Sequence, residues 1–367
     1  MDRTETISWV ISVCAVYLRL SQAKTLGTLV AAAMRCPRVS LANLGRQMLG
    51  SAKHQIKRCW RFCANERVET ADAMRGVVAR LLKKRKQRLL IAIDWVDIKG
   101  YQTLMASAVL KGRSVPLCWA SCRGHTYDGH RSRNAFEESL LLVLRSMVPR
   151  QVKVIVLADR GFGRTELARF CQRHGFHYVI RIGPRVNVRT ASYEGQLLDY
   201  PVHKGVCKLL RGVSYRSGYR PLVQNVVVRW VRGLPAKRDE CWFLMTDLVA
   251  GPAQISRLYG RRMTIEQLFR DGKSKRNGWS LRDTQLKSPD RLDRLLLILA
   301  LAYLLLCGLG LIAKTRHKPS AWCSTTRATE CSVFLIGLIM LRKLKASPPK
   351  AFAAVADLAE EVLPNWG

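Results

Sequence analysis

Two short, continuously apolar segments that each end in an aspartate constrain the fold of this chain more than any other feature. The first covers residues 89–93 and is followed by Asp94; the second covers residues 152–158 and is followed by Asp159. Uninterrupted apolar runs of this length are typical of strands buried on both faces, as in sheets covered by helices. The sequence therefore predicts an α/β layer in which two carboxylates stand at strand ends.

The segments around these two runs complete a mixed α/β pattern. Strands are expected at 103–110 and 114–120, joined by a hairpin turn at Lys111-Gly112-Arg113, and at 177–182. Helices are expected at 134–147 and 164–174. Residues 184–246 alternate Val and Arg between many turns and predict a β-rich insertion, after which helical periodicity continues from Ala253 through Arg270.

The N-terminal part of the chain has a helical pattern with a basic face. Pro37 and Gly50 divide it into predicted helices at 25–35, 40–49 and 51–63. Lys53, Lys57 and Arg61 recur every four residues and share one face of the third helix. A basic helix that closes a three-helix unit suits docking in the DNA major groove, and the alternative is a solvated face of a helical bundle.

The charge of the chain indicates a polyanionic partner. Its 62 Lys and Arg residues outnumber its 26 Asp and Glu residues, and the formal net charge is +36. Neutralised phosphates release counterions and provide affinity for nucleic acid of any sequence. The alternative is a ribosomal or simply soluble basic protein.

Twelve cysteines are scattered singly and indicate reduced thiols in a cytosol rather than a disulfide scaffold. Cys59 and Cys63, and likewise Cys118 and Cys122, are each separated by three residues, with no His pair at a matching distance. We interpret all four as buried apolar groups rather than metal ligands.

Two apolar stretches require a comparison with membrane segments. Residues 7–18 follow a leader without net positive charge, so a core or amphipathic helix is expected rather than a signal sequence. Residues 295–313 are long enough to span a bilayer. We expect a buried helix there as well, because the stretch stands alone in a very basic chain.

The aspartates at the strand ends are the first candidates for chemistry. If the two strands lie side by side, Asp94 and Asp159 can share a divalent cation, which prefers hard oxygen ligands. The alternative is that each aspartate only caps a strand or turn. Asp97 is a competing candidate, but it lies beyond the buried run, so we favour Asp94.

A third carboxylate lies in the helical segment near residue 260. Tyr259, Arg262, Glu266 and Lys273 are separated by three, four and seven residues. On one ideal helix these four side chains would fall within an arc of about 60°. They would combine a metal-ligating carboxylate with three donors suited to phosphate. Gly272 is a point at which the helix would end or loosen before Lys273.

This spacing resembles the signature of bacterial insertion-sequence DDE transposases whose third segment is called YREK, the insertion sequence family four group. The resemblance spans most of the chain, because the order of the other motifs also agrees. These motifs are the strand ending in Asp94, the turn Asp159-Arg160-Gly161-Phe162, and Trp242-Phe243-Leu244-Met245-Thr246.

The resemblance implies a fold and a division of the chain. The fold is α/β: a ribonuclease H-like catalytic core interrupted by a β-rich insertion, with an N-terminal all-helical DNA-binding domain and a helical C-terminal tail. The helical DNA-binding domain would cover 1–77, the core 78–183 and 250–314, the insertion 184–249, and the tail 315–367. Residues 295–313 would then be a helix packed on the core sheet.

The resemblance also implies a reaction and its residues. Asp94, Asp159 and Glu266 would bind two Mg²⁺ ions, for which Mn²⁺ can substitute, and catalyse DNA cleavage and strand transfer. Tyr259, Arg262 and Lys273 would hold phosphates of the DNA end. Trp242 would stack on a flipped base; the alternative is a core tryptophan, and Trp230 is a weaker candidate for the same role.

The expected partners are double-stranded DNA, as the inverted-repeat ends of the element and as target, and a second copy of the chain in a synaptic dimer. No membrane is expected, and the protein would act in the bacterial cytoplasm at the nucleoid. Two alternatives remain: a metal-dependent nuclease without strand transfer, and a non-catalytic DNA-binding remnant.

Overall fold

The computed structural model describes residues 1–83, 88–124, 126–215, 222–230, 241–275, 278–281, 284–324 and 331–360. The chain divides into two compact units. The first contains Met1–Lys86, Trp95–Val148 and Glu266–Leu363, and the second contains Gln87–Asp94, Pro149–Ile265 and Pro364–Gly367. Strand β1 and helix α9 each contribute residues to both units.

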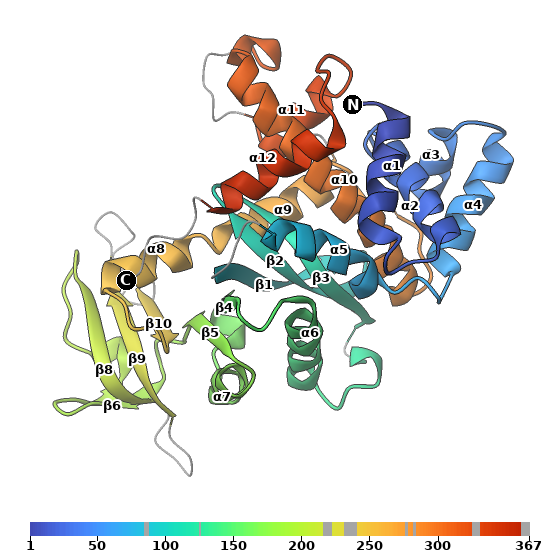
Figure 1. The fold of residues 1–367 in the computed structure, drawn as a ribbon. Helices are drawn as coiled ribbons and strands as arrows, with labels where there is room; N and C mark the ends of the chain where they lie inside the picture. Colours follow the sequence, from blue (N-terminus) through green and yellow to red (C-terminus); the bar gives the residue numbers. More distant parts are fainter. Residues whose placement is uncertain are drawn as a thin grey trace. The chain divides into compact units, whose positions relative to one another are not determined.

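Five helices begin the first unit (Figure 1). Side-chain oxygens fix two of their starts, because Asp2 accepts from the backbone of Thr4 and Glu5, and Ser40 accepts from that of Asn43. Their bounds are α1 Arg3–Cys14, α2 Leu20–Ala33, α3 Leu41–Arg46, α4 Ala52–Ala64 and α5 Thr70–Leu82. The three predicted helices therefore exist as α2, α3 and α4, and the stretch at 7–18 belongs mainly to α1.

The long apolar helix α10, Pro289–Arg316, forms the centre of the first unit. It is the one helix in the described chain long and apolar enough to cross a membrane, and 94% of its most apolar window is buried within the protein. It packs on strand β3, on α2, and on α11 and α12 (Figure 1). The expectation of a buried helix on the sheet is thus confirmed, because this apolar surface is covered by protein.

Two glycines of α10 allow its neighbours to approach closely. A Cβ at Gly308 would lie 1.9 Å from the carbonyl oxygen of Ala351 in α12, and one at Gly310 equally close to that of Val333 in α11. Only glycine fits at these two positions. The remaining helices of this unit are α6 Arg133–Met147, α9 Met263–Lys273, α11 Val333–Met340 and α12 Pro348–Glu360.

A buried arginine attaches the N-terminal helices to α10. Arg294 donates to the carbonyl oxygen of Val68 at 3.2 Å and to that of Cys63, near the end of α4, at 3.1 Å. The bond to Cys63 satisfies a carbonyl that the end of α4 leaves unpaired. The N-terminal helices and α10 belong to the same compact unit.

The sheet of the first unit has the order β3-β2-β1, in which β2 and β3 form the expected hairpin. Their bounds are β1 Arg88–Ile98, β2 Tyr101–Leu110 and β3 Arg113–Arg123. The predicted turn between β2 and β3 contains Gly112 at φ +74°, a conformation that favours glycine.

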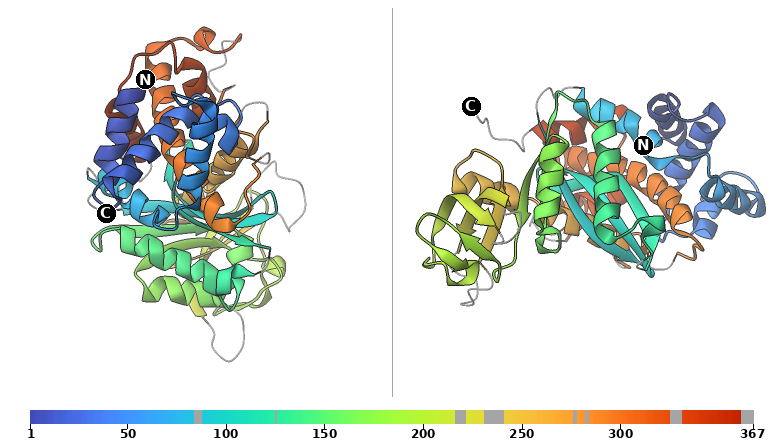
Figure 2. Two further views of the ribbon diagram at one scale, coloured as in Figure 1. Left: turned by 90° about the vertical axis from the view of Figure 1, so that its right-hand side faces the viewer. Right: turned by 90° about the horizontal axis from the view of Figure 1, so that it is seen from below.

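The sheet of the second unit has the order β1-β4-β5-β10-β9-β8-β6-β7. Strands β8 and β9 are among the yellow-green arrows in Figure 2. Strands β1, β4 and β5 are parallel to one another, and β10 pairs antiparallel with β5. The predicted β-rich insertion therefore extends the same sheet. The bounds are β4 Lys153–Ala158, α7 Thr165–Arg173, β5 Phe176–Arg181, β6 Asn187–Arg189, β7 Glu194–Gln196, β8 Cys207–Tyr215, β9 Leu222–Arg229, β10 Trp242–Thr246 and α8 Pro252–Gly260.

The structure corrects the expectation of one continuous helix from 253 to 270. Helix α8 ends at Gly260 and α9 begins at Met263, with a turn at Arg261 and Arg262 between them. The backbone N–H groups of Arg262 and Ile265 bond to carbonyls three residues earlier, which is the tighter 3₁₀ pattern. Periodicity did not reveal this break, because apolar positions continue on both sides of it.

The cysteine interpretation is confirmed for the four residues in question. Cys59, Cys63, Cys118 and Cys122 are all buried. Burial raises the pKa of Cys63 and of Cys118 to about 12, so these thiols are protonated near neutral pH.

Candidate active site

Asp94 and Asp159 lie on two neighbouring parallel strands, at the same distance past their last paired residues. The structure corrects the expectation of two strand ends: Asp159 directly follows β4, whereas Asp94 lies within β1, which continues to Ile98. Strands β1 and β4 pair in register from Arg88 with Lys153 to Ala92 with Leu157. Two further residues along each strand lead to Asp94 and Asp159. The condition for a shared cation, that the two strands lie side by side, is therefore met within the second unit.

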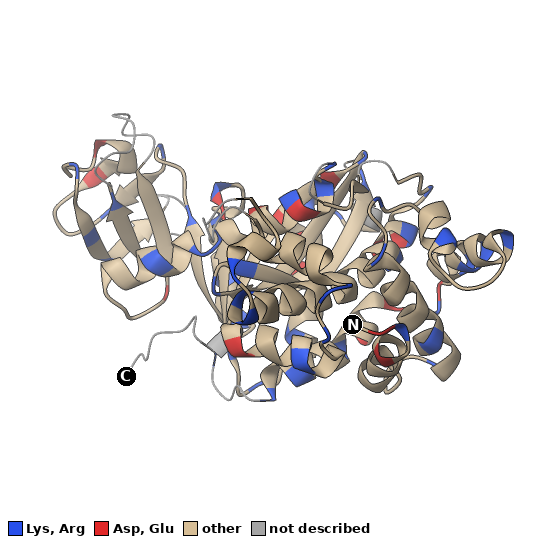
Figure 3. Cartoon of the chain, turned by 90° about the horizontal axis from the view of Figure 1, so that it is seen from above, with Lys and Arg blue, Asp and Glu red and all other residues tan. Residues whose placement is uncertain are grey.

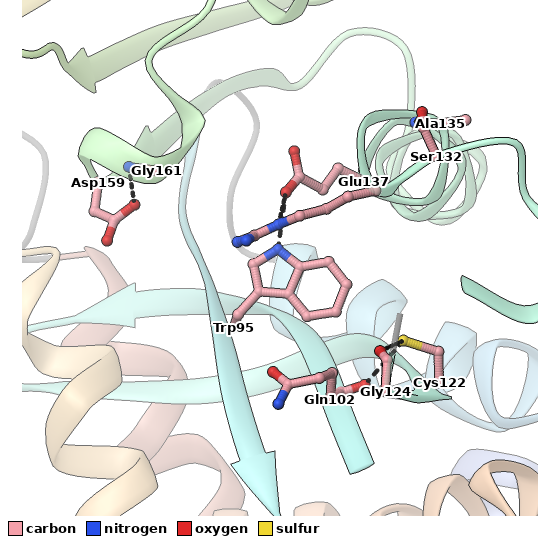
Figure 4. A network of polar contacts seen from close by, with 10 residues as sticks. Trp95, Gln102, Cys122, Gly124, Ser132, Ala135, Glu137, Asp159 and Gly161 are labelled. Atoms are coloured by element: carbon pink, nitrogen blue, oxygen red, sulfur yellow. Dashed lines mark hydrogen bonds and ion pairs between the residues drawn. The ribbon is translucent and has the colours of Figure 1, made fainter. Parts of the chain in front are cut away.

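A short turn holds Asp159 at the end of β4. The residue caps the 3₁₀ helix η2, Arg160–Phe162, and its Oδ1 accepts from the backbone N–H of Gly161 at 2.8 Å (Figure 4). Phe162 is buried and anchors this turn in the core. The carboxylate is half-buried, so its position is fixed while solvent still reaches it.

Asp94 forms an ion pair with Arg262. Arg262 Nη1 donates to Asp94 Oδ2 at 3.0 Å, and the two side chains are 8% and 17% exposed. Sequence reasoning assigned Arg262 to DNA phosphate, whereas in the free chain the guanidinium is buried against a candidate metal ligand. The sequence did not reveal this partnership, since the residues are 168 positions apart.

Tyr259 and Trp242 form an aromatic pair in the same unit. Their ring centroids are 5.1 Å apart in an edge-to-face arrangement, and the Arg229 guanidinium lies 5.0 Å from the centre of the Trp242 ring. Burial raises the pKa of Tyr259. The positive charges of Arg262 and Arg181 lower this pKa, and the negative charge of nearby Asp159 raises it. Arg181 therefore belongs to this cluster, although sequence reasoning did not select it.

The other two members of the predicted stripe lie in α9. Glu266 is in the first turn of this helix and Lys273 is its last residue, and both are half-buried. From Glu266 onward, the residues of α9 belong to the first unit, whereas Tyr259 and Arg262 belong to the second. The turn before α9 interrupts the single ideal helix on which the predicted stripe depends.

A buried network that sequence reasoning missed fixes α9 in the first unit. Asp271 accepts from Arg113 Nη1 at 2.9 Å, from the Tyr303 hydroxyl at 3.0 Å and from Ser332 Oγ at 3.1 Å. Burial raises the pKa of Asp271, and the Arg113 charge opposes this. Three elements thus hold the helix that carries Glu266.

A second missed network surrounds the residue after Asp94. The indole N–H of Trp95 donates to Glu137 Oε1 at 2.8 Å, and Arg133 Nε donates to the same oxygen at 3.1 Å (Figure 4). Trp95 also stacks on Phe136, with 5.5 Å between ring centroids. The Glu137 side chain is 1% exposed, so these donors compensate the desolvation of a buried charge.

The competing aspartate, Asp97, has a local role in a hairpin. Its carboxylate accepts from the backbone N–H of Gly100 at 3.4 Å and from Gln102 Nε2 at 3.1 Å. Lys99 and Gly100 in this turn both have positive φ. These contacts give Asp97 a structural function and agree with the preference for Asp94.

The basic face of α4 is exposed as its periodicity indicates. Lys53, Lys57 and Arg61 are all exposed, whereas Cys59, Phe62 and Cys63 of the same helix are buried. Lys and Arg residues occur on elements of both units (Figure 3). Helix α4 therefore presents one positively charged surface to a DNA partner, and other elements carry further positive charge.

The donor types on these two neighbouring strands fit a divalent cation. Asp94 and Asp159 offer carboxylate oxygens, which hard cations prefer. In the described part of the chain, no three His, Cys, Asp or Glu side chains are already gathered around one point. To bind a cation, Asp94 would have to coordinate it either in addition to Arg262 or in place of Arg262.

Comparison with known proteins identifies one family. A family model described as transposase DDE domain matches residues 85–305, which is more than half of the chain. Comparison with curated proteins found no match. The matched range includes both aspartates, the β-rich strands, α9 and part of α10.

Proposed function

This chain belongs to the transposase DDE domain family, and we propose that it cleaves and joins DNA at the inverted-repeat ends of an insertion sequence. Membership of the family implies a ribonuclease H-like core, DNA as partner and a divalent metal. The finer assignment to the YREK-bearing insertion sequence family four group rests on the spacing of Tyr259, Arg262, Glu266 and Lys273.

The observation that carries this proposal is the parallel register that places Asp94 of β1 and Asp159, which follows β4, two residues past the same pair of partners. Carboxylates held on neighbouring core strands move little, because the strands themselves are buried and hydrogen-bonded. Glu266 is the third proposed ligand. It lies in the first turn of a helix that the Asp271 network holds in place.

Two Mg²⁺ ions, or Mn²⁺ in their place, are the proposed cofactors. Bound there, they would activate the attacking water or 3′-hydroxyl and stabilise the leaving oxygen of an in-line phosphoryl transfer. Asp94, Asp159 and Glu266 would hold these ions. The protein would act as a homodimer in the cytoplasm, at the nucleoid.

Arg262 has a double role in this proposal. In the free chain it neutralises Asp94 and so reduces the repulsion between two carboxylates on adjacent strands. When DNA binds, the same guanidinium becomes a donor to a phosphate, for which its planar fork is suited. Tyr259 and Lys273 are the other proposed phosphate contacts, and Trp242 is proposed to stack on an unpaired base.

The test is cleavage and strand transfer with purified protein, Mg²⁺, DNA carrying the inverted repeats that flank the coding region, and a target plasmid. We expect cut ends and joined products from the wild-type chain. Asp159→Ala should form neither, while binding to the same DNA persists, because binding depends on phosphate contacts elsewhere.

The matched control is Asp97→Ala, which removes a carboxylate from β1, the strand of Asp94, without touching the proposed ligands. It should retain cutting. Substantial Mg²⁺-dependent cutting by Asp159→Ala would contradict the ligand assignment. Cut ends without joined products would instead identify a nuclease.

A further inference from the structure

One face of the sheet in the second unit carries a row of side chains from three strands. Cys207 of β8 pairs with Arg229 of β9, which pairs with Trp242 of β10. Residues directly opposite each other on adjacent strands project from the same face. Helix α8 packs on β8 and β9, and its Ser256 Oγ lies 3.4 Å from Cys207 Sγ.

A cavity of about 660 Å³ lies beside this row. Its described lining includes three cationic side chains, one indole and no carboxylate. The cations are Lys204, Arg229 and Arg257, and the indole is Trp230. Lys204 and Arg257 are exposed, so a ligand from solvent can reach them.

The positive charge of this cavity is not neutralised by the described protein. None of the ion pairs formed in the described parts of the chain includes Lys204, Arg229 or Arg257. Burial lowers the pKa of neighbouring Arg261, and the charge of Arg257 lowers it further. An anionic ligand would relieve this repulsion.

The indole of Trp230 adds a second feature that suits a ligand. Backbone hydrogen bonds fix its main chain, because its N–H donates to the carbonyl of Val206 at 2.9 Å and its carbonyl accepts from Gly205 at 2.7 Å. The ring is half-buried, and its Nε1 is buried with no acceptor among the described residues. Such a donor gains from any acceptor that a ligand supplies.

Contacts within the unit connect this cavity to the candidate active site. Arg229 lines the cavity and also lies over the ring of Trp242. Trp242 in turn contacts Tyr259, whose pKa responds to the charge of Asp159. A nucleic-acid strand leaving the candidate active site along these side chains would arrive at Lys204 and Arg257.

We propose that the cavity lined by Lys204, Arg229, Trp230 and Arg257 binds a nucleotide of a single DNA strand. The cations hold its phosphates and the Trp230 ring stacks on its base. This inference rests on the proposed function, because it takes DNA as the substrate. It adds a binding site away from the metal ligands, which positions the unpaired strand.

The experiment measures fluorescence anisotropy of a labelled oligo-dT of about 12 nucleotides, within the span of a single-strand site. EDTA is present throughout, so binding is scored independently of cutting. We expect Lys204→Ala/Arg257→Ala to weaken binding. We also expect it to lower the slope of log K against log salt by about 1.4, at about 0.7 per phosphate contact.

Trp230→Leu should give a different signature. Loss of a stacking platform should weaken binding by roughly 5- to 100-fold and leave the salt slope unchanged. The matched control is Arg173→Ala/Arg185→Ala, which removes two exposed cations of the same unit that do not line the cavity. Thermal unfolding of every variant checks that each remains folded.

The inference would be overturned if Lys204→Ala/Arg257→Ala and the control Arg173→Ala/Arg185→Ala gave the same slope of log K against log salt. It would also be overturned if millimolar inorganic phosphate displaced the oligonucleotide. Cleavage by the wild-type chain is measured separately. If it cuts DNA but the cavity variants bind normally, only this inference fails. If it never cuts but the variants lose binding, the site stands and the proposed reaction fails.

Discussion

The Arg262 guanidinium donates to the carboxylate of Asp94 at 3.0 Å, and both side chains are largely buried. A residue that acted only on DNA phosphate would contribute little to the stability of the free protein. This pairing gives Arg262 a role in the free chain as well. It also places a positive charge where a divalent cation would have to bind.

Arg262→Lys should therefore lose both stability and activity. Lysine keeps the charge but cannot reproduce the planar fork, so we expect a loss of about 1.5–3 kcal/mol, the range for a hydrogen bond to a charged group. Urea unfolding measures this alongside DNA cleavage per folded molecule. Arg270→Lys, at an exposed position of α9, is the control. Unchanged stability would show that the Asp94 pair contributes nothing.

Mg²⁺ should raise the melting temperature of the wild-type chain. A ligand that binds only the folded state stabilises it by about 2.7 kcal/mol at one hundred times its Kd. Asp159→Ala should lose most of this shift, and Asp97→Ala should retain it. Thermal unfolding with increasing Mg²⁺ measures the difference. Equal shifts in all three proteins would place the metal elsewhere.

The exposed face of α4 should contribute to duplex binding. Lys53→Ala/Lys57→Ala should lower the slope of log K against log salt by about 1.8, at about 0.9 per phosphate contact. Lys24→Ala/Arg67→Ala removes the same charge from exposed positions outside α4. Titration of a labelled duplex at several salt concentrations compares them. A slope equal to that of the wild type would assign this face to solvent.

Glu137 should stabilise the part of β1 that carries Asp94. Glu137→Ala leaves the Trp95 and Arg133 donors without their acceptor, and we expect a loss of about 1–3 kcal/mol. Trp95→Phe keeps the ring and removes only the indole N–H. Urea unfolding of both single variants and the double variant measures their coupling. Strictly additive losses would exclude an energetic link between these side chains.

The His177–Asp247 pair should make stability depend on pH. His177 Nδ1 lies 2.8 Å from Asp247 Oδ2, and this hydrogen bond raises the pKa of His177 above 6.5. A raised pKa in the folded state gives stability that is complete below 6.5 and is lost as pH rises through the folded-state pKa. Melting temperatures across this range should fall more for the wild type than for Asp247→Asn. Parallel curves would contradict the prediction.

The sequence identified the local elements well where one physical signal dominated. The runs before Asp94 and Asp159 are buried strands, as their short and uninterrupted apolar sequence predicts. The buried stretch at 295–313 and the turn at Lys111-Gly112-Arg113 were also predicted, since burial and positive φ leave direct marks on residue type. The order of carboxylates and the YREK spacing pointed to the family that the comparison found.

Only the tertiary structure decided which side chains meet. The pairing of Arg262 with Asp94, the Asp271 network and the contact of Trp95 with Glu137 join residues 168, 158 and 42 positions apart. The break between α8 and α9 likewise depends on packing, because apolar periodicity continues across it. Local sequence determines which conformation each segment prefers. Long-range partners are selected by the register of strands and the packing of helices, which no local pattern encodes.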